Sequence, residues 1–222
     1  MAHAMGITST GRDFPNVCAI TLGSVGFTPL ELTDVYATIA SGGIHHAPQA
    51  FETVRGPNAK LIGKISTAGN KVLDPNYAAE LTYALQGVIS YGTGTAASLY
   101  PRPAAGKTGT AENYQDAWFC GFVPQLATCV WVGYPAGEIS LQNVEGVGTV
   151  FGGTLPAQIW RDFMAPAVAP WPVENFPTPT FTGTYWSGSG TYTYAPGSYP
   201  TTTTATTTTT TATPKTKPPK RR

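Results

Sequence analysis

The sequence predicts an α+β fold, with an antiparallel sheet flanked by helices. Helix signals stand before and after a run of three strand-like segments, and the last two segments are separated only by Pro124-Gln125. So short a connection permits antiparallel pairing alone, since parallel strands need a long crossover. The third observation is that the composition changes abruptly after residue 174, where threonine, proline, glycine and serine become dominant. It predicts that the folded part ends there.

The first helix is predicted to begin at the capping-box sequence Thr28-Pro29-Leu30-Glu31, which has proline at its first helical position. Apolar residues then recur at helical spacing and should form one buried face: Leu32, Val35, Tyr36, Ile39 and Ala40. The pair Gly42-Gly43 should end this helix, because glycine readily adopts the backbone conformation that follows a last turn.

A β-hairpin is predicted next, over residues 50–64, with its turn at Gly56-Pro57-Asn58. A second helix should run from Asp74-Pro75 to about Gly92, with one apolar face formed by Leu81, Ala84, Leu85 and Val88. A third helix, near residues 155–165, should pack through Ile159, Trp160 and Phe163 and close at Pro166.

The three strand-like segments between the second and third helices are residues 104–112, 117–124 and 126–135. If the hairpin is symmetric about Pro124-Gln125, Cys120 and Cys129 lie directly opposite each other. A cross-strand disulfide is then possible, although we favour ordinary buried thiols. The third cysteine is Cys18, and the three form neither a C-x-x-C motif nor a metal-binding spacing.

Composition and charge divide the chain into residues 1–174, which we expect to fold, and residues 175–222, a Thr/Pro-rich tail that we expect to be disordered. The first part carries eight basic and twelve acidic side chains, and this balance argues against nucleic-acid binding. The tail has five basic residues and no acidic ones. We favour a solvated tail with no partner; the alternatives are a spacer, a glycan-bearing stalk, or a segment whose basic end weakly attracts an acidic polymer. We expect neither a signal peptide nor a membrane segment in this chain.

The most informative stretch is Lys107-Thr108-Gly109-Thr110 in the first predicted strand. Gly109 has no Cβ, so the backbone of an extended peptide can approach and pair with this strand edge. Thr108 and Thr110 point to one face and present two hydroxyls toward a carboxylate or carbonyl. Lys107 projects to the other face, but near the start of a twisted strand it can lean into a cleft and act on protons or anions.

The surroundings of this motif resemble the third active-site motif of penicillin-binding proteins, in the order AAGKTGTAEN and then DAWFCGFVPQLATCVWVGYP. Residues 22–48 resemble the helix and glycine turn upstream in that family, and residues 88–97 resemble its glycine-rich segment before the motif. The resemblance covers about residues 5–168 and is closest to the C-terminal part of the transpeptidase domain of bifunctional, class A members. It implies the fold shared with serine β-lactamases, in incomplete form, and a place on the extracytoplasmic side of the cell envelope.

The resemblance also implies a mechanism and the roles of the motif. A serine attacks the penultimate D-alanine of a peptidoglycan stem peptide, releases the terminal D-alanine, and passes the acyl group to an amine of a neighbouring stem. β-Lactams imitate the D-Ala-D-Ala end. Lys107 would belong to the catalytic, proton-handling set, and Thr108, Gly109 and Thr110 would bind the substrate, with the N–H of Thr110 as an oxyanion donor. No cofactor and no metal are implied.

Two further motifs of that family, S-x-x-K with the nucleophile and S-x-N, are missing from these 222 residues. No serine has lysine three positions later or asparagine two positions later. We therefore expect the nucleophile to come from the upstream half of the domain, and whether this chain is an enzyme stays open. The alternative is a non-catalytic truncated remnant or a cell-wall-binding protein, and a piece of a serine β-lactamase fits less well.

Smaller signals favour structural explanations. The pair His45-His46 follows the Gly-Gly helix end and suggests a solvated turn. Gly92-Thr93-Gly94 follows a helix, whereas a phosphate-binding fingerprint needs a preceding strand. Glu112 and Asp116 are best explained as solvated loop charges.

Overall fold

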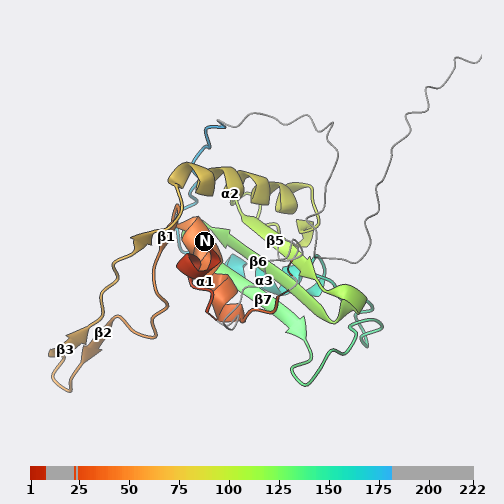
Figure 1. Cartoon of the computed structure of the whole chain (residues 1–222), viewed down its shortest axis with the longest axis horizontal. Helices are drawn as coiled ribbons and strands as arrows, with labels where there is room; N and C mark the ends of the chain where they lie inside the picture. Colours follow the sequence, from red (N-terminus) through yellow and green to blue (C-terminus); the bar gives the residue numbers. More distant parts are fainter. Residues whose placement is uncertain (9–22, 24, 182–222) are drawn as a thin grey trace, which may run out of the picture. The chain divides into compact units, whose positions relative to one another are not determined.

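A computed structural model describes residues 1–8, 23 and 25–181, and it confirms the α+β fold with an antiparallel sheet flanked by helices (Figure 1). The sheet has the order β5 (Ala105–Thr110), β6 (Asp116–Val123) and β7 (Leu126–Gly133). Helices α1 (Pro29–Ala40) and α3 (Leu155–Val168) both contact β6 and β7. Helix α2 (Pro75–Ser90) packs on β5 and so adjoins the strand of the Lys-Thr-Gly motif.

The remaining elements are short. Two small antiparallel pairs are formed by β1 (Ile44–His45) with β4 (Asn70–Lys71), and by β2 (Thr53–Arg55) with β3 (Leu61–Lys64). Single 3₁₀ turns occur at η1 (Ala2–Met5), η3 (Thr95–Ala97) and η4 (Glu112–Tyr114). The β2–β3 hairpin turns where the sequence predicts, and Figure 1 shows it projecting from the body.

Local chemistry explains why α1 begins at Pro29. The Oγ1 atom of Thr28 accepts a hydrogen bond from the backbone N of Glu31 at 3.3 Å, and Glu31 Oε2 accepts one from the backbone N of Thr28 at 3.1 Å. This reciprocal pair is the predicted capping box, and it satisfies two backbone donors that a helix start leaves free. The helix ends before Gly42 and Gly43, whose φ angles of 70° and 89° favour glycine.

Side chains of the sheet alternate between two layers. Phe119 faces α3 and is fully buried against Trp160, with ring centroids 5.3 Å apart, whereas Phe122 lies in the cluster that contains Ile39 of α1. The indole Nε1 of Trp160 donates to the carbonyl oxygens of Gly121 and Thr128 at 3.3 and 3.0 Å. Helix α3 is thus held on the β6–β7 hairpin by apolar packing and by a satisfied polar atom.

The predicted apolar face of α2 is wrong in part. The buried residues are Ala78, Ala79, Thr82, Leu85 and Ile89, while Leu81 is 41% exposed and Ala84 is exposed. Helix α2 carries apolar side chains on two sides, and periodicity alone does not reveal which side the sheet covers.

The predicted face and end of α3 also need correction. Trp160 is buried as expected, but Ile159 and Phe163 are 41% and 53% exposed, and the core is filled from Pro156, Ala157, Met164 and Val168. The helix does not close at Pro166 but runs to Val168. Proline removes one N–H donor, and near a helix end this loss does not unwind the last turn.

Packed residues continue beyond residue 174, where we expected the folded part to end. Phe176 packs edge-to-face on Phe122, with ring centroids 5.4 Å apart. Asn76 of α2 donates to the carbonyl oxygen of Thr180 and accepts from its backbone N, both at 2.8 Å. Phe181 packs edge-to-face on Tyr83, with ring centroids 5.3 Å apart, so two aromatic rings and one hydrogen-bonded pair hold this segment, which composition alone does not suggest. The rest of the predicted tail, residues 182–222, lies outside the described residues.

The β6–β7 register agrees with the prediction, since Cys120 pairs with Cys129 across a two-residue turn. The two cysteines form a disulfide, with Cα atoms 4.1 Å apart, so the expectation of free thiols is wrong. Direct opposition in the sheet brings the two side chains together, which the sequence shows only once the register is known. Cys18 lies outside the described residues. None of the helices within residues 1–8, 23 and 25–181 has the length and apolarity to cross a membrane.

Candidate active-site strand

Strand β5 places the Lys-Thr-Gly motif at an edge of the sheet. Among the described residues, β6 is its sole strand partner. The backbone N of Ala111 donates to the carbonyl oxygen of Asp116 at 2.9 Å, so the N–H and C=O groups of Ala111 point toward β6. Backbone groups alternate in direction along an antiparallel strand, so those of Lys107 and Gly109 point toward β6 as well. The N–H and C=O groups of Thr108 and Thr110 therefore point away from β6, toward the unpaired edge.

The hydroxyl groups of Thr108 and Thr110 lie on the sheet face that α3 covers. Thr108 Oγ1 lies 2.7 Å from Oγ1 of Thr93, so one hydroxyl donates to the other. Thr110 Oγ1 accepts a hydrogen bond from the backbone N of Gly152 at 3.1 Å. This contact uses a lone pair and leaves the hydroxyl hydrogen of Thr110 free to donate to a carboxylate.

Lys107 is exposed and projects from the opposite face, as its position in the strand requires. Its Nζ nevertheless reaches the strand edge, where it donates to the carbonyl oxygen of Thr108 at 2.8 Å. The lysine charge is thus held beside the backbone edge that carries Thr108 and Thr110.

Glycines allow two loops to approach this strand. A Cβ built on Gly152 would lie 2.4 Å from the carbonyl oxygen of Trp118 and 2.5 Å from that of Gly109. A Cβ on Gly153 would lie 2.2 Å from the carbonyl oxygen of Thr93. The loop before α3 therefore packs directly over the motif, because neither position has a side chain.

Three of these residues were missed by the sequence reasoning: Thr93, Gly152 and Gly153. Thr93 lies within residues 88–97, which we had included in the family resemblance and had judged unsuitable as a phosphate loop, but to which we had assigned no contact. Its contact with Thr108 spans fifteen positions of sequence. The Gly-Gly pair before a predicted helix was the signal for the second loop, but it does not identify the partner strand.

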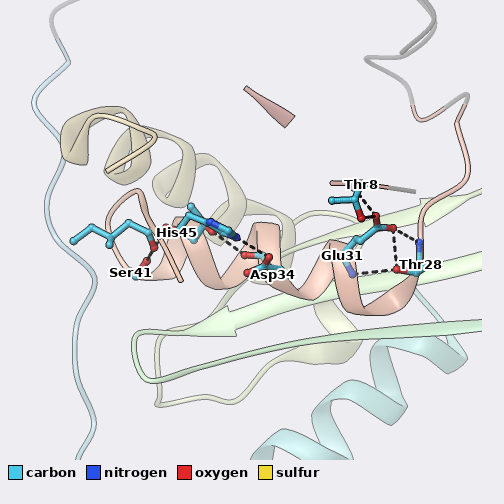
Figure 2. Close-up of polar contacts among 8 residues, drawn as sticks. Thr8, Thr28, Glu31, Asp34, Ser41 and His45 are labelled. Carbon is cyan, nitrogen blue, oxygen red and sulfur yellow. Dashed lines mark hydrogen bonds and ion pairs between the residues drawn. The ribbon is translucent and has the colours of Figure 1, made fainter. Parts of the chain in front are cut away.

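The remaining candidate polar residues have structural partners. The buried carboxylate of Asp34 accepts a hydrogen bond from Nε2 of His45 at 2.8 Å, so His45 is not the solvated turn residue that we expected (Figure 2). Glu31, also buried, accepts from the backbone N and Oγ1 of Thr8 at 2.6 and 3.0 Å (Figure 2). Asp116 accepts from Nε1 of Trp131 at 2.7 Å. These contacts hold the chain start, β1 and β7 in place.

Two pKa values are shifted by their surroundings. Burial raises the pKa of Tyr36 to about 12, so its phenol stays neutral at ordinary pH. The backbone N–H of Asn76 and then the Lys71 ammonium lower the pKa of Asp74, which caps α2. Within the described part of the chain, no three His, Cys, Asp or Glu side chains lie together so as to hold a metal ion.

Comparisons with known proteins identify relatives over most of this chain. Residues 12–164 match the family model "Penicillin binding protein transpeptidase domain". Penicillin-binding protein 1A of Mycolicibacterium smegmatis is 32% identical over 186 residues, which are 81% of this chain and 23% of that protein. Penicillin-binding protein 1A of Mycobacterium tuberculosis is 31% identical over 203 residues, or 83% of this chain and 24% of that protein. The chain thus spans about a quarter of the length of these curated relatives.

Solved structures show the same likeness. The penicillin-binding protein PonA1 of Mycobacterium tuberculosis superposes with a TM-score of 0.71 at 30% identity, covering 81% of this chain and 51% of that one. PonA1 in complex with penicillin V gives a TM-score of 0.70, with the same identity and coverage. An imipenem acyl-enzyme of penicillin-binding protein A from Mycobacterium tuberculosis gives 0.60 at 27% identity, covering 76% and 41%.

Proposed function

This chain belongs to the penicillin-binding protein transpeptidase family, and we propose that it is the Lys-Thr-Gly part of a peptidoglycan D,D-transpeptidase domain. One observation carries the proposal: β5 presents Thr108 and Thr110 at an edge that no other strand of the described residues covers. Their hydroxyls lie on one face, and the Lys107 ammonium donates to the Thr108 carbonyl oxygen at that edge. An extended peptide that ends in D-Ala-D-Ala meets backbone, hydroxyl and cationic groups there within one short strand.

Thr108 and Thr110 bind the substrate in this proposal. Their hydroxyls donate to the terminal carboxylate of the stem peptide, and the contacts with Thr93 and Gly152 hold them in the required rotamers. The outward-pointing N–H of Thr110 donates to the oxyanion that forms when the penultimate carbonyl is attacked. A Cβ on Gly109 would project to the opposite face of the strand and lie 3.2 Å from Cβ of Trp118, so glycine keeps that side of the strand open.

Lys107 supplies positive charge and handles a proton near the reacting carbonyl. Its hydrogen bond to the carbonyl oxygen of Thr108 keeps Nζ at the strand edge before substrate arrives. A second acceptor, such as the attacking serine oxygen or the substrate carboxylate, can take over one of its three N–H donors. Such a preplaced cation lowers the energy of negative charge that develops in the transition state.

The nucleophile comes, in this proposal, from the upstream half of the domain, which we infer to pack on two surfaces. One is the outer edge of β7, a strand that pairs only with β6 among the described residues, although helices contact it. The other is the stripe of α2 that carries Tyr77, Leu81 and Tyr91, which are 58%, 41% and 85% exposed. An open strand edge and an exposed apolar stripe are both features that a neighbouring part of a domain normally covers.

The same edge is the proposed binding site for β-lactams, whose carboxylate and carbonyl imitate the end of the stem peptide. The solved complexes of PonA1 with penicillin V and of penicillin-binding protein A with imipenem, which this chain resembles, support this proposal. The Cys120–Cys129 disulfide supports the extracytoplasmic side of the cell envelope as the working compartment, since disulfides persist where the surroundings are oxidising.

Site-directed variants of the protein that contains this chain test the proposal by the rate of acylation with a fluorescent penicillin. Thr108→Val and Lys107→Ala should each slow acylation by about tenfold or more. Thr108→Val removes a hydrogen bond to the ligand carboxylate, and Lys107→Ala removes the positive charge near the reacting carbonyl. Thr53→Val and Lys60→Ala on the exposed β2–β3 hairpin are matched controls and should leave the rate unchanged. Equal rates for the site and control variants would reject these roles.

A further inference from the structure

We propose that the Cys120–Cys129 disulfide positions Lys107, so that reduction of this bond slows acyl transfer without preventing ligand binding. The proposal rests on the proposed function, in which Lys107 handles a proton. Its basis is one row of residues across the sheet: Lys107 pairs with Cys120, and Cys120 pairs with Cys129.

Cys120 is linked to its two neighbours in different ways. Ala111 and Asp116 form a hydrogen-bonded pair, and so do alternate pairs along the same two strands. Lys107 and Cys120 are one of these pairs, so the backbone N–H and C=O of Cys120 point toward Lys107. On the other side, Cys120 and Cys129 therefore form a pair without mutual backbone hydrogen bonds, with Cα atoms 4.1 Å apart. The disulfide is thus the direct link between β6 and β7 in this row.

The row ends at the reactive group. Cys120 is only 3% exposed, whereas Lys107 is exposed and extends its Nζ to the carbonyl oxygen of Thr108. A shift of the backbone at Cys120 moves the backbone of Lys107 with it, because the two residues share the ladder between β5 and β6. Thr108 and Thr110 face the opposite side of β5, where Thr93 and Gly152 hold them independently of the disulfide.

Reduction needs a dithiol, which is a two-electron donor. One thiolate of the reductant attacks the sulfur of Cys129, which is less buried than Cys120, and Cys120 leaves as a thiolate that takes a proton. The second thiolate of the reductant then attacks the reductant sulfur that is bonded to Cys129 in the mixed disulfide. Cys129 leaves as a thiolate, which also takes a proton. The products are two cysteine thiols and the cyclic disulfide of the reductant.

The test is the acylation kinetics of the protein that contains this chain, oxidised and reduced, with a fluorescent penicillin. The acylation rate constant should fall by about tenfold on reduction, since a small misplacement of a catalytic group has effects of this order. The dissociation constant of the non-covalent complex should change by less than about twofold, because the hydroxyls that bind the carboxylate are held separately. Reoxidation should restore the rate.

Two variants sharpen the result. The double variant Cys120→Ala/Cys129→Ala should show the slow rate and no response to the reductant, while Cys18→Ala should respond as the parent protein does. A rate constant that is unchanged by reduction would overturn the proposal. So would a fall in the labelled fraction alone, because that outcome indicates a loss of stability.

A separate readout distinguishes this proposal from the proposed function. If neither redox state reacts with penicillin, the proposed function fails, and hydrogen exchange by mass spectrometry then decides the positioning role. The amides of Lys107 and Cys120, which pair across β5 and β6, should exchange about tenfold faster after reduction, while amides of the β2–β3 hairpin stay unchanged. Equal exchange of the Lys107 and Cys120 amides in both states would overturn the proposal.

Discussion

Replacing Gly152 by alanine tests how the loop before α3 holds β5, the strand of the proposed active site. The new Cβ would lie 2.4, 2.5 and 2.8 Å from the carbonyl oxygen of Trp118 and from the carbonyl oxygen and N of Gly109. All three are backbone atoms of paired strands, so none can move aside as a flexible side chain would. The loop must instead retreat, by about 0.6 Å before the shortest contact reaches 3.0 Å.

That retreat has two measurable consequences. The hydrogen bond from the backbone N of Gly152 to Thr110 Oγ1, now 3.1 Å long, stretches beyond a useful length and frees the rotamer of Thr110. The strain and the lost bond together should destabilise the protein by about 1–3 kcal/mol. Penicillin should bind more weakly as well, since the Thr110 hydroxyl, which we propose to meet its carboxylate, is no longer held.

Chemical denaturation followed by tryptophan fluorescence measures the first effect, and saturation kinetics with a fluorescent penicillin measure the second. Gly137→Ala is the matched control, because a Cβ built there meets nothing within 4 Å. That control should stay within about 0.5 kcal/mol of the parent protein. If Gly152→Ala behaves like Gly137→Ala in both assays, the packing of this loop on the strand is not what holds Thr110.

The other predictions concern stability. Thr28→Ala should lower the free energy of unfolding in denaturant by about 1 kcal/mol, because the capping box of α1 loses its side-chain acceptor. Thr33→Ala is the control, since its hydroxyl donates to the carbonyl oxygen of Pro29 within the helix, and it should lower that free energy by less than about 0.5 kcal/mol. The pKa of Tyr36 is about 12 in the folded protein and about 10 in an unfolded chain, so the neutral phenol favours the folded state below pH 10 and this advantage is lost as the pH rises from 10 to 12. Unfolding free energies measured across that range should fall by up to about 2 kcal/mol from this group, and Tyr36→Phe should remove that part of the slope. An unchanged slope in Tyr36→Phe would contradict the assignment.

Elements whose ends are set by neighbouring residues could be predicted from the sequence. The start of α1 depends on Thr28 and Glu31, which are three positions apart, and its end depends on glycine. The β6–β7 register follows from the two-residue turn and the alternation of the strands, so Cys120 opposite Cys129 was within reach of sequence reasoning. The disulfide itself could not be predicted, because the register shows that the two cysteines are close but not that they are bonded.

Features set by distant packing could not be predicted in the same way. Helix α2 has two apolar sides, and only the position of β5 decides that Leu85 is buried and Leu81 is not. The proposed site is of this kind in part: Lys107 to Thr110 were singled out through the resemblance of their surrounding sequence to a known family, whereas Thr93 and Gly152 reach them only through the fold.

Fluorescent-penicillin labelling of membranes from the source organism tests whether this chain is part of a working, penicillin-reactive transpeptidase. The labelled bands are then searched by peptide mapping for residues 107–161. If the chain is part of such an enzyme, these peptides should appear in a labelled band well above the 23.3 kDa of this chain. Their presence only in an unlabelled species near that mass would rule this out and favour a non-catalytic remnant.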